Sequence, residues 1–129
     1  MKALVSCFLV LACMASCLNK RCDNAFKEAR KQNRDTTLMY IWHRVIYISK
    51  YDSGYVSFKP NGDYLSSISM KYLNGVGGVW HTSGNTLIRT QCSEFTPHHM
   101  DCKYKVQNDT LILWADQPYP DKYIKVLKY

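Results

Sequence analysis

The sequence predicts an all-β protein: a small eight-stranded antiparallel up-and-down barrel, preceded by a signal peptide and a short basic linker. From Thr36 onward, β-branched and aromatic residues dominate. Turn residues interrupt them at a spacing of roughly eight to twelve residues, which is typical of sandwiches and barrels. No segment after the linker has a helical period, so successive strands should pair as antiparallel neighbours. Closure of the sheet would remove the exposed edge strands.

Turn residues divide the first half of this region into four expected strands. The first is rich in Tyr, Ile and Val, and Asp52-Ser53-Gly54 ends it. Pro60-Asn61-Gly62-Asp63 is a strong turn, because Pro presets one dihedral angle and Gly readily takes a positive one. The strands are expected at residues 37–50, 55–59, 64–72 and 79–82.

The second half contains four more expected strands. Ser83-Gly84-Asn85 and Asn108-Asp109 mark two of the turns, and a longer loop is expected between Gln91 and Lys103. The strands are expected at residues 86–91, 103–107, 110–115 and 122–128. Alternation along the strands then assigns faces. The residues predicted to point inward are Val56, Phe58, Tyr104, Val106, Leu111, Leu113, Ile124 and Val126, and those predicted to face water are Lys103, Lys105 and Lys125.

The N-terminal residues 1–16 are predicted to be a lipoprotein signal peptide. A positive end precedes an almost unbroken apolar run over residues 3–15. About thirteen helical residues rise only about 20 Å, which is too short to span a bilayer. Met14-Ala15-Ser16-Cys17 resembles a bacterial lipobox, although methionine stands where leucine is usual. This resemblance implies cleavage before Cys17 and acylation of its sulfur. Ordinary secretion, with cleavage after Ala15 or Ser16, is the alternative.

Residues 17–36 are predicted to form a lipidated basic linker, followed by a single barrel domain at residues 37–129. The formal charge of +7 includes Lys2, so removal of the signal peptide leaves +6. A basic segment next to an acyl anchor would be attracted to anionic lipid by about 1 kcal/mol per Lys or Arg. A solvated tether is the alternative. A short helix is expected here, with an apolar stripe of Phe26 and Ala29 that is too thin to dock firmly.

Four stretches of the chain resemble the lipocalin-like domains of bacterial lipoproteins found in Bacteroidetes-type genomes. They are YVSFKPNGDYLSS, GVGGVWHTSGNTLIRT, YKVQNDTLILW and DKYIKVLK, and the resemblance covers most of residues 38–128. In the first strand, Tyr40-Ile41-Trp42 stands where the family often has Gly-x-Trp. The resemblance implies a small barrel and specifies no activity, because its motifs are mostly those that form the fold.

Cys92 and Cys102 are predicted to form a disulfide. They would lie at the facing ends of the fifth and sixth strands, where neighbouring strands are about 5.5 Å apart. In an oxidising compartment the bridge would stabilise the fold by about 2 to 3 kcal/mol. A zinc site that uses both thiolates with His98 or His99 is the alternative. Cys22 has no evident partner once Cys17 is acylated, and a free thiol and a bridge between two chains are both open for it.

The sequence contains no recognisable catalytic motif. It has no Gly-x-Ser-x-Gly elbow, no Gly-rich phosphate loop and no acid/base pair of carboxylates. The basic charge is not accompanied by a nucleic-acid recognition motif, so no nucleic-acid partner is expected. We therefore predict a non-catalytic protein with no cofactor and no metal.

Binding of a small ligand is the function that the aromatic content favours. An eight-stranded barrel has an interior that side chains fill or that holds one small ligand. The residues expected to line such a cavity are Trp42, Phe58, Trp80, Tyr104 and Trp114. Alternatively, the same side chains form a packed core with no cavity.

The predicted function is a membrane-anchored lipoprotein that binds a small hydrophobic or amphipathic ligand in the cell envelope. The alternative is a protein-interaction or scaffold module with a filled barrel. Its charge disfavours a basic partner, and the sequence identifies no protein partner. Leu18 does not resemble the aspartate that retains lipoproteins in the inner membrane, so an outer-membrane location facing the periplasm is expected. Secretion is the alternative location.

Overall fold

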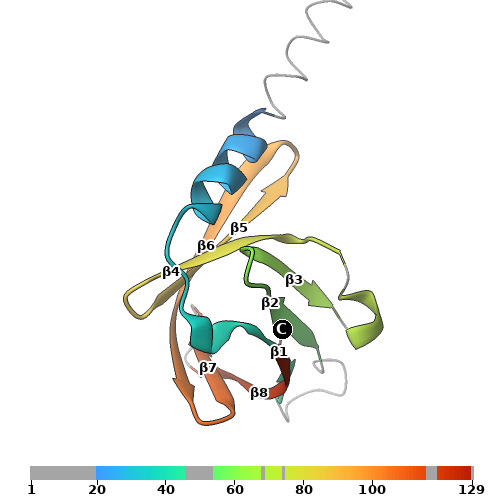
Figure 1. Ribbon diagram of the computed structural model, residues 1–129, viewed down its shortest axis with the longest axis vertical. Coiled ribbons are helices and arrows are strands. Elements are labelled where there is room, and N and C mark those ends of the chain that lie inside the picture. Colours follow the sequence, from blue (N-terminus) through green and yellow to red (C-terminus); the bar gives the residue numbers. More distant parts are fainter. Residues whose placement is uncertain (1–19, 46–53, 68, 74, 116–118, 129) are drawn as a thin grey trace, which may run out of the picture.

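The predicted closed barrel of eight antiparallel strands is confirmed by the computed structural model, which describes residues 20–45, 54–67, 69–73, 75–115 and 119–128 (Figure 1). Each strand pairs with its neighbour in sequence, and β1 pairs with β8 to close the sheet. The strands are β1 (Tyr40–Arg44), β2 (Tyr55–Phe58), β3 (Asp63–Ser67), β4 (Gly78–Ser83), β5 (Thr86–Ser93), β6 (Thr96–Gln107), β7 (Thr110–Trp114) and β8 (Asp121–Lys128).

In the described part of the chain, three short helical segments accompany the barrel. The described chain begins with an α-helix over residues 20–30, and two 3-10 turns follow, η1 (Thr36–Leu38) and η2 (Met70–Tyr72). The predicted signal peptide and Cys17 lie outside the described residues.

The predicted turn before β3 is present and is fixed by two residues. Gly62 has a φ of 91°, and the backbone N–H of Asp63 donates to Oδ1 of Asn61 at 2.9 Å. Gly84, between β4 and β5, also has a positive φ, of 57°. Glycine adopts this region without the steric cost that a Cβ would bring. The turn residues therefore set the strand pairing that the sequence predicts.

A cluster of large side chains fills one end of the barrel. Trp42, Phe58 and Trp80 are fully buried, and the Phe58 and Trp80 rings meet edge to face at 5.2 Å. Both indole N–H groups are satisfied by backbone carbonyls, Trp42 by Leu38 and Trp80 by Lys59, each at 3.0 Å. Leu38 of η1 is itself fully buried. The η1 segment thus closes the end of the barrel at which β1 begins.

The hairpin of β5 and β6 is longer than predicted. The expected loop between Gln91 and Lys103 is replaced by paired strands that continue to Ser93 and Thr96. Glu94 and Phe95 make the two-residue turn with φ values of 50° and 62°. These values belong to the left-handed region, which Gly and Asn usually occupy. Because neither residue is a typical turn former, the sequence did not reveal the hairpin.

The predicted faces of β8 are wrong. Ile124 and Val126 are 47% and 43% exposed, whereas Tyr123 packs against the core. Lys125, predicted to face water, places its Nζ 4.1 Å from the centroid of the Tyr40 ring. The pairing of β1 with β8 changes register between Ile41 and Trp42, and a one-residue offset exchanges the two faces of a strand. The other predicted faces are confirmed, with Val106 only partly buried.

The N-terminal helix docks on the barrel, so the prediction of a linker that does not dock is wrong. Figure 1 shows the helix beside the β5–β6 hairpin. An ion pair of 2.8 Å joins Arg30 to Asp63. After the helix, the carbonyl of Asn33 accepts a hydrogen bond from the backbone N–H of Thr82 at 2.9 Å. Ala29, which supplied half of the thin apolar stripe, is buried. These specific contacts hold the helix where apolar area alone would not.

Candidate functional site

Four of the five aromatic residues predicted to line a cavity are gathered in the barrel core. Trp42, Phe58 and Trp80 are fully buried, and Tyr104 is 8% exposed. Trp114 is 40% exposed, while its neighbour Leu113 belongs to the core. The prediction that Trp114 lines the interior is therefore wrong, since successive residues of a strand point to opposite faces.

The inward side chains of the barrel include a polar group beside the aromatic cluster. The end near η1 is apolar and aromatic, as described above. Beside these aromatic residues, toward the Ser93 end of β5, inward positions carry polar and charged side chains. Tyr64 stacks on Phe58, and Arg89 pairs with Trp80, so the two groups are in contact. Leu87 of β5 belongs to the core, and alternation places Arg89 and Gln91 on the same side of that strand. The inward residues at this end are Arg44, Tyr64, Arg89, Gln91, Met100, Cys102 and Tyr123, which we call the polar end of the interior.

Arg89 occupies the wall at the polar end. Its register partners are Trp80 on β4 and Met100 on β6. The guanidinium carbon lies 5.8 Å from the centroid of the Tyr64 ring, which is a cation–π distance. Its Nε atom is buried and has no hydrogen-bond partner among the described residues. Our sequence reasoning missed Arg89, although its spacing of two residues from Leu87 is the signal that would have found it.

The neighbouring titratable groups respond to this environment. Burial raises the pKa of the Cys102 thiol, and Arg89 partly opposes that shift. Burial also raises the pKa of Tyr123, where Arg44 and Arg89 oppose the shift and Asp121 adds to it. Both groups are therefore neutral at physiological pH. They can donate hydrogen bonds and carry no negative charge.

An ion pair and a side-chain hydrogen bond complete the polar end. Arg44 contacts Asp121 at 2.8 Å, and both side chains are about one-third exposed. The side-chain amide of Gln91 donates a hydrogen bond to the hydroxyl of Tyr64. Burial raises the pKa of Tyr64, so this hydroxyl also keeps its proton. Two guanidinium groups and one carboxylate thus surround neutral hydroxyl, thiol and amide groups.

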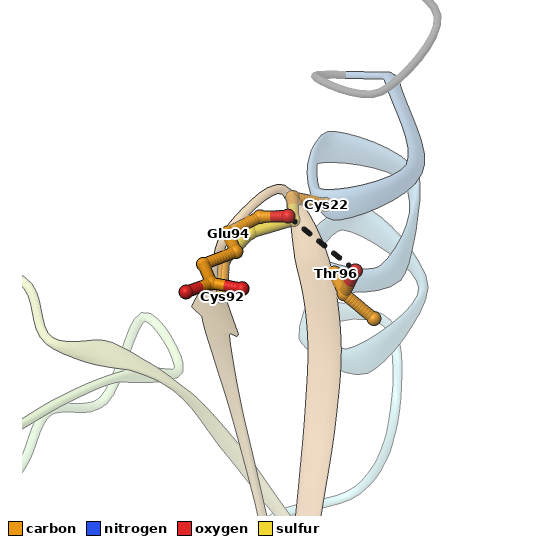
Figure 2. Close-up of a disulfide and its surroundings, with 4 residues drawn as sticks. All are labelled: Cys22, Cys92, Glu94 and Thr96. Atoms are coloured by element: carbon orange, nitrogen blue, oxygen red, sulfur yellow. Dashed lines mark hydrogen bonds between the residues drawn. A yellow bond between two sulfur atoms is a disulfide. The ribbon is translucent and has the colours of Figure 1, made fainter.

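The disulfide joins Cys22 to Cys92 (Figure 2). The bridge predicted from the sequence, between Cys92 and Cys102, is therefore wrong. Cys92 pairs in register with Pro97, whereas Cys102 pairs with Leu87. An odd separation of five residues along β6 puts these two positions on opposite faces of the hairpin. Cys92 faces the helix, and Cys102 is a buried free thiol in the barrel core. The predicted bridge is therefore impossible in this register.

Figure 2 places the bridge just below the β5–β6 turn, where Thr96 donates to the carbonyl of Glu94 at 3.5 Å. The bonded residues are 70 positions apart, with Cα atoms separated by 6.0 Å. The disulfide therefore fixes the N-terminal helix to the far end of the longest hairpin. Docking of the helix supplies the partner that the sequence did not reveal for Cys22.

The zinc alternative finds no support in the geometry. The described residues contain no group of three or more His, Cys, Asp or Glu side chains placed to hold a metal ion. His98 is exposed, and His99 engages the hydroxyl of Thr90 through Nδ1 at 2.9 Å. Cys92 is committed to the disulfide. The residues considered for zinc are thus separated or already partnered.

A hollow lies outside the barrel, between the N-terminal helix and the sheet. It has a volume of about 310 Å³ and is lined by Ala25, Glu28, Ala29, Gln32, His81, Thr90 and His99. Burial lowers the pKa of His81, so this imidazole is neutral at physiological pH. The small side chains of Ala25 and Ala29 leave this space between the helix and the strands.

Comparison with known proteins adds no family assignment. No family model matches the chain, and no curated protein or solved structure gives a match. Among the residues that the structure describes, none of the helices has the length and apolar character needed to cross a membrane.

Proposed function

We propose that this protein is a non-catalytic binding protein of the cell envelope, whose barrel takes a small amphipathic ligand and whose N-terminus is anchored in a membrane. The observation that carries the proposal is the placement of Arg89, whose Nε is buried without a hydrogen-bond partner, against the aromatic residues of the core. A core built only for stability has little reason to hold a guanidinium, because burial of a charge is costly unless the charge is paired.

An amphipathic ligand suits this distribution of side chains. Its polar group would meet Arg89 and the hydroxyls of Tyr64 and Tyr123. Its apolar part would lie against inward aliphatic residues such as Val56 and Leu113, which are 4% and 3% exposed. A barrel of eight strands accommodates one small ligand at most, so we expect a one-to-one complex.

The disulfide supports membrane attachment close to the barrel. Cys17, the proposed acylated residue, precedes Cys22 by five positions, so the acyl chains would begin within about 18 Å of the bridge. Several acyl chains at about 0.8 kcal/mol per buried methylene give stable anchoring. Lys20, Arg21 and Lys27 on the helix are exposed and would add attraction to anionic lipid. The barrel would therefore sit directly on the membrane surface.

Native mass spectrometry of the protein purified from its own source tests both parts of the proposal. We expect a chain that begins at an acylated Cys17, contains one disulfide and retains one non-covalent amphipathic ligand. A complementary titration would follow uptake of phenylnaphthylamine, a neutral probe that fluoresces in apolar sites. A protein without a retained ligand that also takes up no probe would contradict ligand binding. An intact Cys17 thiol would contradict anchoring.

A protein-interaction module with a filled barrel is the second candidate. Exposed apolar side chains on β7 and β8 favour it, namely Trp114, Ile124, Val126 and Leu127, which are 40% to 54% exposed. Met100→Trp separates the two candidates, because an added indole beside Arg89 would obstruct a ligand and leave the outer surface unchanged. Lys105→Trp, on the exposed side of β6, is the matched control. Loss of probe uptake in the first variant alone supports the ligand site.

A further inference from the structure

We propose that the polar group of the ligand is an anion, a single carboxylate or a group of similar chemistry, and that Arg89 binds it. The inference rests on the proposed function and specifies the ligand class for the same site. It follows from the placement of Arg89, from the charge at the polar end and from the hydrogen-bond donors around it.

Arg89 is held in place, but no carboxylate neutralises it. The Tyr64 ring lies against its guanidinium at 5.8 Å, and Trp80 and Met100 are its neighbours on the adjacent strands. Within the described part of the chain, no Asp or Glu forms an ion pair with Arg89, and its Nε has no hydrogen-bond partner. A partly buried guanidinium in this state favours an incoming anion, because a charge-assisted hydrogen bond is about twice as strong as a neutral one.

The other charges at the polar end do not remove this preference. The carboxylate of Asp121 contacts Arg44 at 2.8 Å, and so it serves a different guanidinium. Arg44 and Asp121 balance each other, so the charge of Arg89 is the one at the polar end that no described carboxylate pairs with. An anion would balance that charge, whereas a cation would add to it. A neutral head group would leave it unchanged.

The neighbouring hydroxyls supply further donors. In the hydrogen bond from Gln91, the oxygen of Tyr64 is the acceptor, so the Tyr64 proton can be donated to a ligand. Tyr123 packs against the same core and interacts electrostatically with both Arg44 and Arg89. A planar guanidinium matches the two oxygens of a carboxylate, and a phenol adds a third donor. The arrangement therefore fits a carboxylate better than an alcohol or an amine.

The test compares two ligands that share one chain and differ in head-group charge. The full chain, purified with the Cys22–Cys92 bridge intact, is loaded with phenylnaphthylamine and titrated with dodecanoate or with dodecanol. Wild type should bind dodecanoate at least tenfold more tightly than dodecanol. Arg89→Gln should weaken dodecanoate binding by about tenfold to a hundredfold, which is the loss expected for hydrogen bonds to a charged group. The same variant should change dodecanol binding by less than about twofold.

Three controls keep the outcomes distinct. Arg21→Gln removes the same charge from the exposed helix and should change neither affinity. Arg89→Lys keeps the charge but loses the planar fork, so dodecanoate affinity should fall between wild type and Arg89→Gln. If Arg89→Gln also loses the reporter through misfolding, the salt dependence of the wild-type protein decides. Higher salt should then weaken dodecanoate binding and leave dodecanol binding unchanged.

The results separate failure of this inference from failure of the proposed function. Equal wild-type affinities for dodecanoate and dodecanol, or an Arg89→Gln variant with normal dodecanoate affinity, would overturn the role of Arg89. In both cases reporter uptake would still support a ligand-binding barrel. If neither reporter nor ligand binds to wild type, both the inference and the proposed function are wrong.

Discussion

Asp35 stabilises the closed end of the barrel through hydrogen bonds that its carboxylate accepts. The backbone N–H of Thr37 donates to Oδ1 at 2.9 Å, and the hydroxyl of Tyr104 donates to Oδ2 at 2.8 Å. Burial raises the pKa of Asp35, but the bonds from Thr37 and Tyr104 outweigh it, so the pKa lies below its ordinary value. The folded protein therefore favours the ionised form of Asp35 more than the unfolded chain does.

A lowered folded-state pKa makes the contribution of Asp35 depend on pH. The stabilisation is complete above the unfolded-state pKa of about 3.9 and is lost as pH falls through the lower folded-state value. We expect Asp35→Asn to be less stable than wild type at pH 7, with the difference shrinking toward pH 3. Urea unfolding at several pH values measures this. Asp109→Asn, at a carboxylate that is 80% exposed, is the control. A stability difference between Asp35→Asn and wild type that stays constant with pH would contradict a lowered pKa of Asp35.

The tryptophans should differ sharply in their contribution to stability. Trp80→Ala would empty a fully buried site and should cost about 3 to 5 kcal/mol. Trp114→Ala, at a residue that is 40% exposed, should cost much less, on the order of 1 kcal/mol. Chemical denaturation of the two variants gives both values. Equal losses would mean that Trp114 belongs to the core after all.

At the scale of elements, the β5–β6 hairpin carries strain in its turn. Glu94 and Phe95 both occupy the left-handed region, where a side chain costs roughly 1 to 2 kcal/mol per residue. The double variant Glu94→Asn, Phe95→Gly supplies the preferred residues of this turn type. We expect it to raise the free energy of unfolding by about 1 kcal/mol. Asn108→Ala, at a φ of 54° between β6 and β7, should instead lower the free energy of unfolding. Destabilisation by the double variant would show that the native side chains make essential contacts.

The disulfide should dominate the docking of the N-terminal helix. For a separation of 70 residues, the loop-entropy model gives about 4 kcal/mol. We expect Cys22→Ser to lose about this amount and to expose the helix to trypsin at Arg21 and Lys27. Cys102→Ser breaks no bridge, so it is the control for helix docking and should leave both trypsin sites protected. Protection of both basic sites in Cys22→Ser would mean that Arg30–Asp63 and the Asn33–Thr82 contact hold the helix unaided.

The sequence predicted the elements well where alternation and turn chemistry agree. Val56 and Phe58 on β2 and Leu111 and Leu113 on β7 face the core as their period of two predicts. The β8 faces were missed because the register shift opposite Ile41 follows from pairing, and pairing cannot be read from one strand. The Cys22 bridge was missed for a related reason, since it depends on a docked helix. Long-range placement, more than local propensity, was the information that the sequence analysis lacked.

At the scale of the whole molecule, closure of the barrel brings an aromatic cluster and a group of polar side chains together in one interior. The aromatic end was predictable, because Trp42, Phe58 and Trp80 are the residue types that usually bury most surface. The polar end was not, because Arg89 becomes notable only when its neighbours on β4 and β6 and the Tyr64 ring are in place. The proposed function therefore rests on the arrangement of side chains in the closed sheet and not on a short motif.

The most direct test of ligand binding inside the barrel is a titration with dodecanoate followed through the methionine methyl resonances by NMR. Met100 is the neighbour of Arg89, Met39 packs against the core near η1, and Met70 is 40% exposed on η2. We predict a saturable shift of the Met100 methyl signal at one equivalent, a smaller change at Met39 and none at Met70. Shifts confined to Met70, or an unchanged Met100 signal at saturation, would contradict an interior site.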